Sequence, residues 1–198
     1  NNTNQKNKIP KKIKNIGILA NISPRKNIEI VIEALNNLDE NFNLNIAGEI
    51  SSEKYFIELK NMIKKYDLKD QVKFLGFVNN TNNFYKKNDV IILPSFFEGT
   101  SNVILESFKY KKIIIVSNIE ENVNLLPKKY RKYFSFDPNN YDDLIIKLLN
   151  LKYYLKNDIN LIKSYLDKNY CYLENNYSIF KLQNEYLNIF FNHIENQN

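Results

Sequence analysis

Residues Asn88 to Glu106 have the sequence NDVIILPSFFEGTSNVILE, and this stretch decides the fold predicted for the chain. Its apolar run, Val90 to Leu93, is short and rich in β-branched residues, which indicates a strand buried on both faces. Pro94 lacks the N–H that a ladder needs, so the strand should end there. Gly99 allows a tight turn, and residues 100–102 (TSN) are good N-cap residues. The stretch therefore predicts a strand, a loop and a helix N-terminus, an arrangement that offers N–H groups and a positive dipole end to an anion.

The composition indicates one globular domain. At 198 residues the chain is long enough to bury a core, and its apolar content of 43% is near the globular average. No apolar run approaches the roughly 18 residues of a membrane span, and the N-terminal residues lack a secretory pattern. The chain opens on Asn1 rather than Met, which suggests a piece of a longer protein. Its single cysteine, Cys171, suits a reducing compartment, so we expect a cytoplasmic protein.

The formal charge of +6 is spread along the chain. Lysine and asparagine occur in every segment, which is more typical of a biased base composition than of a binding patch. Without a concentrated basic face or a known reading module, nucleic acid is not expected as a ligand. One denser basic segment, Lys128-Lys129 with Arg131-Lys132, is usually a solvated stretch. It leaves open a peripheral contact with an acidic membrane surface or a lipid-linked acceptor.

The rest of the chain alternates between strand and helix patterns. Strands are predicted at Ile13–Ala20, Phe42–Ala47, Val72–Leu75 and Ile113–Val116, with an edge strand at Tyr133–Phe136. Helices are predicted at Ile28–Leu38 (capped by Ser23 or Asn27), from Ser51 to Tyr66, around Phe84-Tyr85 and at Asn102–Tyr110, with a helical turn at Val123–Leu126. From Asn139 onward the pattern is helical, with breaks before helices at about Asp158–Lys168 and Asn175–His193.

This alternation predicts an α/β fold, a Rossmann-like doubly wound parallel sheet with helices on both faces and a helical C-terminal tail. Residues 1–12 are rich in Asn and Lys and are predicted to be a linker or disordered arm, with residues 13–198 forming a single domain. Ligands of such sheets bind beyond the carboxyl ends of the strands, at a topological switch point. Loops at residues 23–26, 76–78 and 95–102 should meet there. They would bring together a cation, a turn and a helix N-terminus, which suit the diphosphate of a nucleotide sugar.

A resemblance to a known family rests on these same residues. Residues Glu98 to Glu106 (EGTSNVILE), behind Pro94-Ser95, resemble the E-x7-E signature of family 4 (group 1) retaining glycosyltransferases. Other pieces stand in the family's order: Gly17 and residues 23–27 (SPRKN), 46–48 (IAG), 72–76 (VKFLG) and 136–138 (FDP). The resemblance covers roughly residues 13–150 and is to the C-terminal, donor-binding domain. It implies one half of a GT-B enzyme, whose active site lies between two Rossmann-like domains, with the N-terminal acceptor domain absent from this chain.

The resemblance implies roles for particular residues. Glu98 matches a glutamate that contacts hydroxyls of the donor sugar, and Lys26 matches a lysine that neutralises the diphosphate. These two are the predicted catalytic residues. Glu106 matches a glutamate that accepts hydrogen bonds from the ribose hydroxyls. The remaining predicted donor-binding residues are Arg25 beside the lysine, Gly76, Phe77 and Val78 along the base, and Gly99, Thr100, Ser101, Asn102 and Val103 around the helix N-terminus.

The implied reaction is retaining transfer of a glycosyl group from a UDP- or GDP-sugar to a glycan, lipid or polysaccharide acceptor. The family works without a bound metal, so no metal or other cofactor is expected. Lys26 and the helix N-terminus must then stabilise the leaving diphosphate. One departure concerns an arginine that usually follows the glycine matched by Gly17, because Ile18 stands there. Whether Arg25 replaces that arginine is left open by the sequence.

Two other functions stay open at this point. Sugar-nucleotide epimerases share the two-domain architecture, and the departure at Ile18 also fits a non-catalytic nucleotide-binding domain. In the second case Glu98 and Glu106 would be ordinary acidic residues of a helix and the loop before it. The interpretation favoured by the residues is the donor domain of a cytoplasmic polysaccharide-biosynthesis transferase, inactive without its other half.

Overall fold

The computed structural model describes residues 9–99 and 101–177 of the chain. The predicted arm at residues 1–12 falls mostly outside this range, and residues 9–12 form no helix or strand. Most of the helix predicted at Asn175–His193 also lies outside the described residues, as does its histidine.

Strands and helices alternate along the chain as predicted. The strands are β1 (Asn15–Leu19), β2 (Asn43–Ala47), β3 (Val72–Gly76), β4 (Val90–Leu93), β5 (Ile113–Ser117) and β6 (Ser135–Phe136). The α-helices are α1 (Ile28–Asn36), α2 (Glu53–Lys65), α3 (Thr81–Lys87), α4 (Asn102–Lys109), α5 (Glu120–Val123), α6 (Arg131–Phe134), α7 (Tyr141–Asn157) and α8 (Ile159–Tyr177). Two short 3-10 helices are η1 (Pro24–Lys26) and η2 (Lys128–Tyr130).

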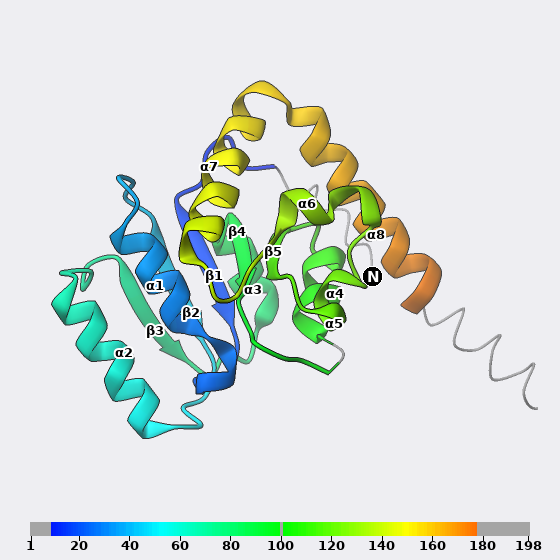
Figure 1. Ribbon diagram of the computed structural model, residues 1–198. Helices are drawn as coiled ribbons and strands as arrows, with labels where there is room; N and C mark the ends of the chain where they lie inside the picture. Colours follow the sequence, from blue (N-terminus) through cyan, green and yellow to red (C-terminus); the bar gives the residue numbers. More distant parts are fainter. Residues whose placement is uncertain (1–8, 100, 178–198) are drawn as a thin grey trace, which may run out of the picture.

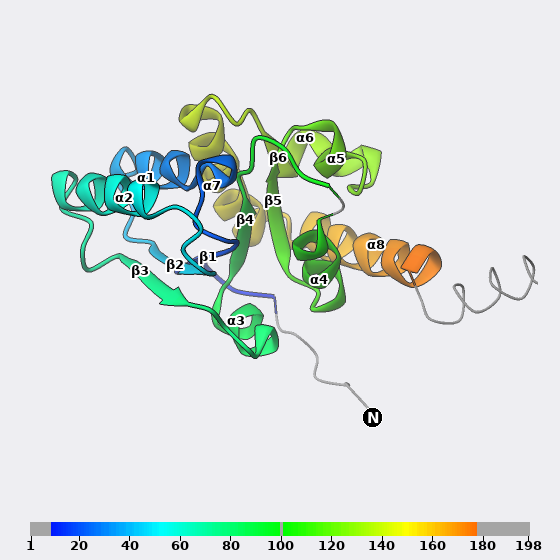
Figure 2. The same ribbon diagram turned by 90° about the horizontal axis from the view of Figure 1, so that it is seen from below.

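The six strands form one parallel sheet in the order β3-β2-β1-β4-β5-β6. The chain leaves β1 toward β2 on one side and returns to place β4 on the other, so the switch point lies between β1 and β4. Helices α1, α2 and α7 cover one face of the sheet, and α3, α4 and α8 cover the other (Figures 1 and 2). The predicted doubly wound α/β fold is therefore confirmed.

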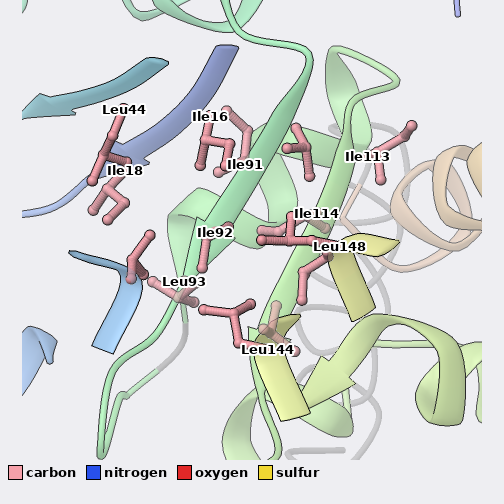
Figure 3. Packing of buried hydrophobic residues seen from close by; sticks show 14 of the residues in the cluster. Ile16, Ile18, Leu44, Ile91, Ile92, Leu93, Ile113, Ile114, Leu144 and Leu148 are labelled. Atoms are coloured by element: carbon pink, nitrogen blue, oxygen red, sulfur yellow. The ribbon is translucent and has the colours of Figure 1, made fainter. Parts of the chain in front are cut away.

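The central strands are buried because helices cover both of their faces. Every residue of β4 and β5 is buried, in keeping with their apolar runs VIIL and IIIV. Leu144 and Leu148 of α7 pack against these strands in the core (Figure 3). The edge strand β3 is largely exposed, because only one neighbour pairs with it. The sheet therefore has a rigid centre, and the carboxyl ends of β1 and β4 are built on it.

Some predicted boundaries are wrong, and tertiary contacts explain one of them. The edge strand predicted at Tyr133–Phe136 is helical up to Phe134, and only the last two residues pair with β5. Phe134 stacks on Tyr165 of α8 with ring centroids 3.7 Å apart, a contact that no local pattern encodes. The helical turn predicted at Val123–Leu126 lies earlier, as α5.

The two longest helices of the described residues, α7 and α8, belong to the predicted helical tail. Asn140 caps α7, and its side chain accepts from the N–H groups of Asp142 and Asp143. Helix α8 continues past the predicted end at Lys168 as far as Tyr177. Over residues 9–99 and 101–177, we find no helix with the length and apolarity that crossing a membrane requires.

Three glycines differ in how much backbone strain and steric clash an added Cβ would cause. Gly48 follows β2 with φ +153°, and a Cβ there would lie 2.0 Å from the carbonyl oxygen of Ala20. Gly76 has φ +67°, but no described atom lies within 4 Å of the point that a Cβ would occupy. Gly99 has neither a clash with described atoms nor a positive φ. Gly48 thus combines strain and clash, Gly76 has strain alone, and Gly99 has neither.

We predict that Gly48→Ala lowers the free energy of unfolding by about 3 kcal/mol or more, because the backbone of the β1 exit must move. Gly76→Ala should cost about 1–2 kcal/mol from the left-handed backbone alone, and Gly99→Ala should stay within about 0.5 kcal/mol. Urea unfolding followed by circular dichroism measures all three. A different order of the three losses would contradict the backbone geometry at these turns.

Candidate functional site

The loops that leave β1 and β4 meet at the switch point. The N–H of Phe96, in the loop after β4, donates to the carbonyl oxygen of Arg25, in the loop after β1, at 3.0 Å. Adjacent parallel strands bring their carboxyl ends to one edge, so loops from distant parts of the sequence can touch there. This backbone bond fixes the two loops side by side.

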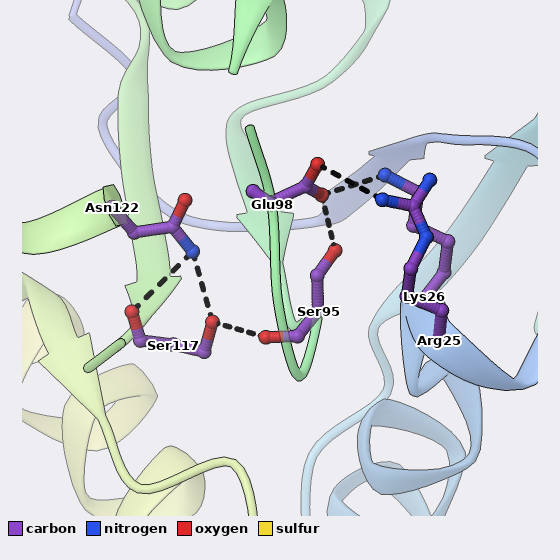
Figure 4. Close-up of polar contacts among 6 residues, drawn as sticks. All are labelled: Arg25, Lys26, Ser95, Glu98, Ser117 and Asn122. Carbon is purple, nitrogen blue, oxygen red and sulfur yellow. Dashed lines mark hydrogen bonds and ion pairs between the residues drawn. The ribbon is translucent and has the colours of Figure 1, made fainter. Parts of the chain in front are cut away.

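A compact ion pair joins the same two loops (Figure 4). Lys26 Nζ donates to Glu98 Oε1 at 2.6 Å, and the two side chains are only 11% and 9% exposed. The hydroxyl of Ser95 donates to the same oxygen at 2.6 Å. Arg25 Nη1 lies 3.9 Å from the other carboxylate oxygen, Oε2. One carboxylate therefore faces two cations and a hydroxyl in a site that is largely shielded from water.

The local backbone explains how two consecutive basic residues reach one carboxylate. Residues Pro24 to Lys26 form the 3-10 helix η1, with Pro24 at its first position, where the fixed φ of proline suits a helix start. Lys26 N–H bonds the Ser23 carbonyl oxygen at 2.9 Å and closes this tight turn. Arg25 remains 42% exposed, and its guanidinium lies 5.3 Å from the centre of the Phe97 ring. Lys26 lies deeper, and Arg25 forms the outer rim.

Asn27 holds this turn in place in a way that differs from the capping role predicted for it. It occupies the N-cap position of α1 with φ 50°, a left-handed conformation that asparagine tolerates better than most residues. Its buried side chain does not cap α1. It donates to the carbonyl oxygens of Pro94 at 3.2 Å and Pro138 at 2.8 Å. Asn27 thus ties the loop after β1 to the segments after β4 and β6.

The departure at Ile18 has a structural reason. Ile18 lies inside β1, is fully buried and faces the hydrophobic core. The isoleucine packs in the core and leaves this position without a cation. Arg25, at the rim and within 3.9 Å of Glu98, is the second cation that this chain provides there.

Helix α4 points its N-terminus toward the same loop. Ser101 is its N-cap, is 5% exposed and makes no side-chain capping bond within the described residues. The first N–H groups of a helix have no intrahelical partner, so those of Asn102 and Val103 are available to an anion. Gly99 is exposed in front of them, and Thr100 lies outside the described residues.

Glu106 lies farther along α4, in another hollow. Its Oε2 is buried and has no hydrogen-bond partner within the described parts of the chain. A cavity of about 250 Å³ opens beside it. The residues that line this cavity are Asn102, Leu105, Glu106, Lys109, Leu173 and Tyr177. No hydrogen bond or ion pair among the described residues joins Glu106 to Lys26 or Glu98.

Tyr85 of α3 lies near the Glu106 carboxylate. Burial above all, and the negative charge of Glu106 next, raise the pKa of the Tyr85 hydroxyl well above its ordinary value. The hydroxyl also lies 3.4 Å from the Val103 carbonyl oxygen and donates to it. Tyr85 is fully buried and is not among the residues that line the cavity, so its hydroxyl lies beside Glu106 without forming part of the cavity wall.

The predicted base-binding turn follows β3. Gly76 ends the strand with its left-handed backbone, and its carbonyl oxygen accepts from Gly48 N–H at 2.9 Å. Phe77 is 66% exposed, and Val78 packs against the core. Three strand spacings separate β3 from β4, on the order of 14 Å at about 4.8 Å each. This turn therefore lies along the same edge as Glu98 without a described contact to it.

Ser95 lies at the centre of the site but was not among the predicted site residues. Its side chain is fully buried and bonds Glu98 three residues later. The local signal was present, because a serine directly after the strand-ending Pro94 stands three residues before the glutamate. Ser117 donates to the Ser95 carbonyl oxygen, and Asn122 donates to the Ser117 hydroxyl. No local sequence signal predicts either contact.

Metal binding was not expected, and it remains a prediction that the site works without one. In the two described ranges, no three His, Cys, Asp or Glu side chains gather as a metal site would require. The cations at the switch point are those of Arg25 and Lys26.

Comparison with known proteins identifies the family of this chain. The family model described as "Glycosyl transferases group 1" matches residues 1–163. An O-antigen biosynthesis glycosyltransferase of Escherichia coli is 27% identical over 176 residues, which are 89% of this chain and 46% of that protein. A second relative in Escherichia coli, named a UDP-Gal:alpha-D-GlcNAc-diphosphoundecaprenol alpha-1,3-galactosyltransferase, is 36% identical over 85 residues, 43% of this chain and 22% of that protein. The chain spans about half or less of the length of the curated relatives it matches.

Solved structures with low sequence identity share the fold. A glycosyltransferase of Rickettsia africae superposes with a TM-score of 0.81 at 23% identity, covering 94% of this chain and 49% of that one. The HepE protein of Anabaena, solved with UDP and glucose, gives a TM-score of 0.77 at 18% identity and covers 90% and 48%. The C-terminal domain of a group 1 glycosyl transferase of Francisella tularensis gives 0.69 at 21% identity and covers 84% and 87%. The described fold therefore corresponds to the C-terminal domain of such proteins.

The shielded ion pair predicts a particular pattern of stabilities. Lys26→Met should lower the free energy of unfolding by about 2 kcal/mol, less than for a fully buried pair because Arg25 and Ser95 still face the carboxylate. The double variant Lys26→Met/Glu98→Gln should recover most of this loss, since it leaves no shielded charge without its partner and Arg25 is 42% exposed to water. Chemical unfolding of the two variants measures the difference.

The exposed pair of Lys54 with Glu58 on α2 is the control. Its atoms are 4.0 Å apart and its side chains are 92% and 55% exposed. Lys54→Met should therefore change stability by less than about 0.5 kcal/mol. An equal loss in Lys26→Met and in the double variant would mean that the contact with Glu98 is not what stabilises the loops.

Proposed function

The chain belongs to the group 1 glycosyl transferases, and from this premise we propose that it binds the nucleoside-diphosphate sugar from which the enzyme transfers a glycosyl group. The donor is a UDP- or GDP-sugar, and transfer retains the anomeric configuration. The observation that carries the proposal is the meeting of Arg25, Lys26 and Glu98 at the switch point between β1 and β4. Open α/β sheets bind their ligands at such points.

The two cations are suited to a diphosphate leaving group. Cleavage of the bond between sugar and phosphate builds negative charge on the phosphate oxygens. Lys26 lies deep in the site and Arg25 at its rim, and the first N–H groups of α4 point to the same region. Preorganised donors of this kind act without reorganisation at the moment of reaction, and removing one typically costs about 3 kcal/mol of transition-state stabilisation. We infer that these groups stabilise the leaving group, with no metal required.

Glu98 is suited to the sugar because its two oxygens have different surroundings. Oε1 accepts from both Lys26 and Ser95, whereas among the described residues Oε2 has only Arg25, at the limit of an ion pair. A carboxylate oxygen can accept more than one hydrogen bond, so Oε2 has capacity left for a hydroxyl of the donor sugar. Glu98 therefore orients the sugar in this proposal and is not the covalent nucleophile. Retention would follow from attack on the face that the phosphate leaves, with the phosphate taking the proton of the acceptor.

The nucleoside would extend along the edge of the sheet from the site of Lys26 and Glu98. Glu106, which lines the cavity of about 250 Å³, is the proposed acceptor for the ribose hydroxyls. The turn at Gly76, Phe77 and Val78 is proposed to line the base, with the exposed Phe77 ring as a surface for stacking. The spacing of roughly 14 Å from β3 to β4 suits a ligand that lies extended across the strand ends.

The acceptor is proposed to bind through the other half of the enzyme. Relatives that this chain covers by half or less have names that mention O-antigen biosynthesis and a diphosphoundecaprenol acceptor. These names support a glycan, polysaccharide or lipid-linked acceptor, and we propose that transfer takes place at the cytoplasmic side of a membrane. Lys128, Lys129 and Lys132 form the exposed part of the basic segment and are proposed to lie near the acidic lipid surface there. The chain by itself should bind the nucleotide and transfer no sugar.

Calorimetry with UDP and GDP tests the phosphate site. Lys26→Ala should weaken binding of the preferred nucleotide roughly ten- to hundredfold, the effect of one charge-assisted hydrogen bond. Lys54→Ala, an exposed lysine on α2, should leave the affinity unchanged. If wild type binds neither nucleotide, the donor-domain proposal fails. If Lys26→Ala binds as well as wild type, the role given to Lys26 fails.

Substitution of Glu98 and substitution of Glu106 should change the nucleotide affinity in opposite directions. Glu98→Gln removes a negative charge beside the phosphate site, so UDP affinity should rise about fivefold, as expected for one unit charge about 4 Å away in a watery dielectric. Glu106→Ala should instead weaken binding of UDP and GDP, because it deletes the acceptor for the ribose hydroxyls. Glu58→Gln on α2 serves as the control for a lost surface charge. Equal nucleotide affinity in wild type and Glu106→Ala would refute the ribose contact.

A further inference from the structure

The peptide group between Ser95 and Phe96 is held at both ends. Its N–H, on Phe96, donates to the Arg25 carbonyl oxygen at 3.0 Å. Its carbonyl oxygen, on Ser95, accepts from the hydroxyl of Ser117 at 2.6 Å. This one peptide unit therefore links the loop after β1 to the end of β5. It directly precedes the turn that carries Glu98.

Asn122 supports Ser117 from the other side (Figure 4). Its Nδ2 donates to Ser117 Oγ at 2.9 Å and lies 3.5 Å from the Ser117 carbonyl oxygen. Ser95, Ser117 and Asn122 are all fully buried. We use the term relay for these three residues together with Glu98, to which the Ser95 hydroxyl donates at 2.6 Å.

The direction of every hydrogen bond in the relay is determined. The carbonyl of Ser117 can only accept, so the atom of Asn122 that faces it must be the NH₂ group. Ser117 Oγ then accepts from Asn122, and its single proton goes to the Ser95 carbonyl oxygen, which also can only accept. Asn122 thus keeps the Ser117 hydroxyl turned toward the peptide unit before Glu98. Neighbouring hydrogen bonds of this kind polarise and strengthen one another.

Asn122 is poorly explained by stability alone. Its Oδ1 is buried and finds no hydrogen-bond partner among residues 9–99 and 101–177. A buried polar atom left unsatisfied is unfavourable for folding and offsets what the two hydrogen bonds of Nδ2 contribute. Asn122, which carries this unsatisfied oxygen, is also the residue that orients the Ser117 hydroxyl.

We propose that Ser117 and Asn122 are positioning residues for Glu98. Neither contacts Glu98. They act through the Ser95–Phe96 peptide unit, which sets where the Ser95 hydroxyl and the Glu98 carboxylate lie. The proposal rests on the donor-binding function above, in which Glu98 receives a sugar hydroxyl. It adds that the end of β5 and the start of α5 control the geometry of sugar recognition from behind the site.

Amide hydrogen exchange followed by NMR tests the local restraint. Ser117→Ala removes the donor to the Ser95 carbonyl, so exchange at the Phe96 N–H should accelerate about tenfold or more while core amides of β4 keep their rates. Ser117→Thr retains the hydroxyl and should restore slow exchange. Ser135→Ala is the matched control, because Ser135 also donates its hydroxyl to a backbone carbonyl, that of Arg131 at 2.7 Å, but outside the relay. Unchanged exchange at Phe96 in Ser117→Ala would overturn the proposal.

Calorimetry with UDP and UDP-glucose tests the link to Glu98. Ser117→Ala should change the ratio of the two affinities about fivefold, the worth of one ordinary hydrogen bond, in the same direction as Glu98→Ala. In a Glu98→Ala background it should change the ratio no further, because residues that act through one group are not additive. Asn122→Leu, which removes the donor to Ser117 without adding charge, should shift the ratio in that same direction and keep the melting temperature.

The outcomes separate this inference from the function on which it rests. A wild-type chain that binds neither probe refutes the donor-domain proposal, and the exchange of Phe96 then decides the relay alone. A wild type that binds both probes, with a ratio unmoved by Ser117→Ala, refutes the positioning role and leaves the proposed function standing. Additive effects of Ser117→Ala and Glu98→Ala would show that Ser117 acts elsewhere, and would also overturn the inference.

Discussion

Two opposite charges held nearly out of water organise this end of the sheet. Lys26 and Glu98 are 72 residues apart in the sequence, yet their atoms lie 2.6 Å from each other with about a tenth of each side chain exposed. Such a pair is weak evidence for net stability, because desolvation offsets much of the attraction. Its consequence is geometric, since either charge alone would be costly there. The loops after β1 and β4 must therefore keep one relative position.

The sheet makes this pairing possible, and the core makes it rigid. Strand β4 returns to lie beside β1 only after the chain has built β2 and β3 on the other side. Both strands are anchored by residues that are buried on the two faces of the sheet, so their carboxyl ends cannot drift apart. Asn27 and the Ser95–Phe96 peptide unit then continue this order beyond the last strand residue. A site assembled in this way is preorganised, because the fold fixes it before a ligand arrives.

The sequence predicts what is local or what a family pattern preserves. The strand at Val90–Leu93 and the helix from Asn102 follow from short-range patterns, and the meeting of Lys26 with Glu98 follows from the rule for parallel sheets. The helix at residues 131–134 is not predicted, because it depends on stacking between Phe134 and Tyr165 of α8. The contact of Ser117 with Ser95 depends on the register between β4 and β5, which sequence spacing does not encode. The absence of a cation at Ile18 was visible in the sequence, and the structure adds that its side chain is buried in the core.

The charge balance of the site bears on turnover as well as on binding. Two cations face one carboxylate, so the site carries a smaller positive charge than Arg25 and Lys26 alone would give it. A sugar transfer leaves a nucleoside diphosphate with more negative charge than the donor had, and an uncompensated pair of cations would hold that product tightly. Under the proposed function, Glu98 would moderate this hold, because it would compete for Lys26 once the sugar has left. Interactions that favour the transition state over both substrate and product raise the turnover rate, and product release often limits it. Under the proposed function, the bond between Glu98 and Lys26 would therefore assist release of the product.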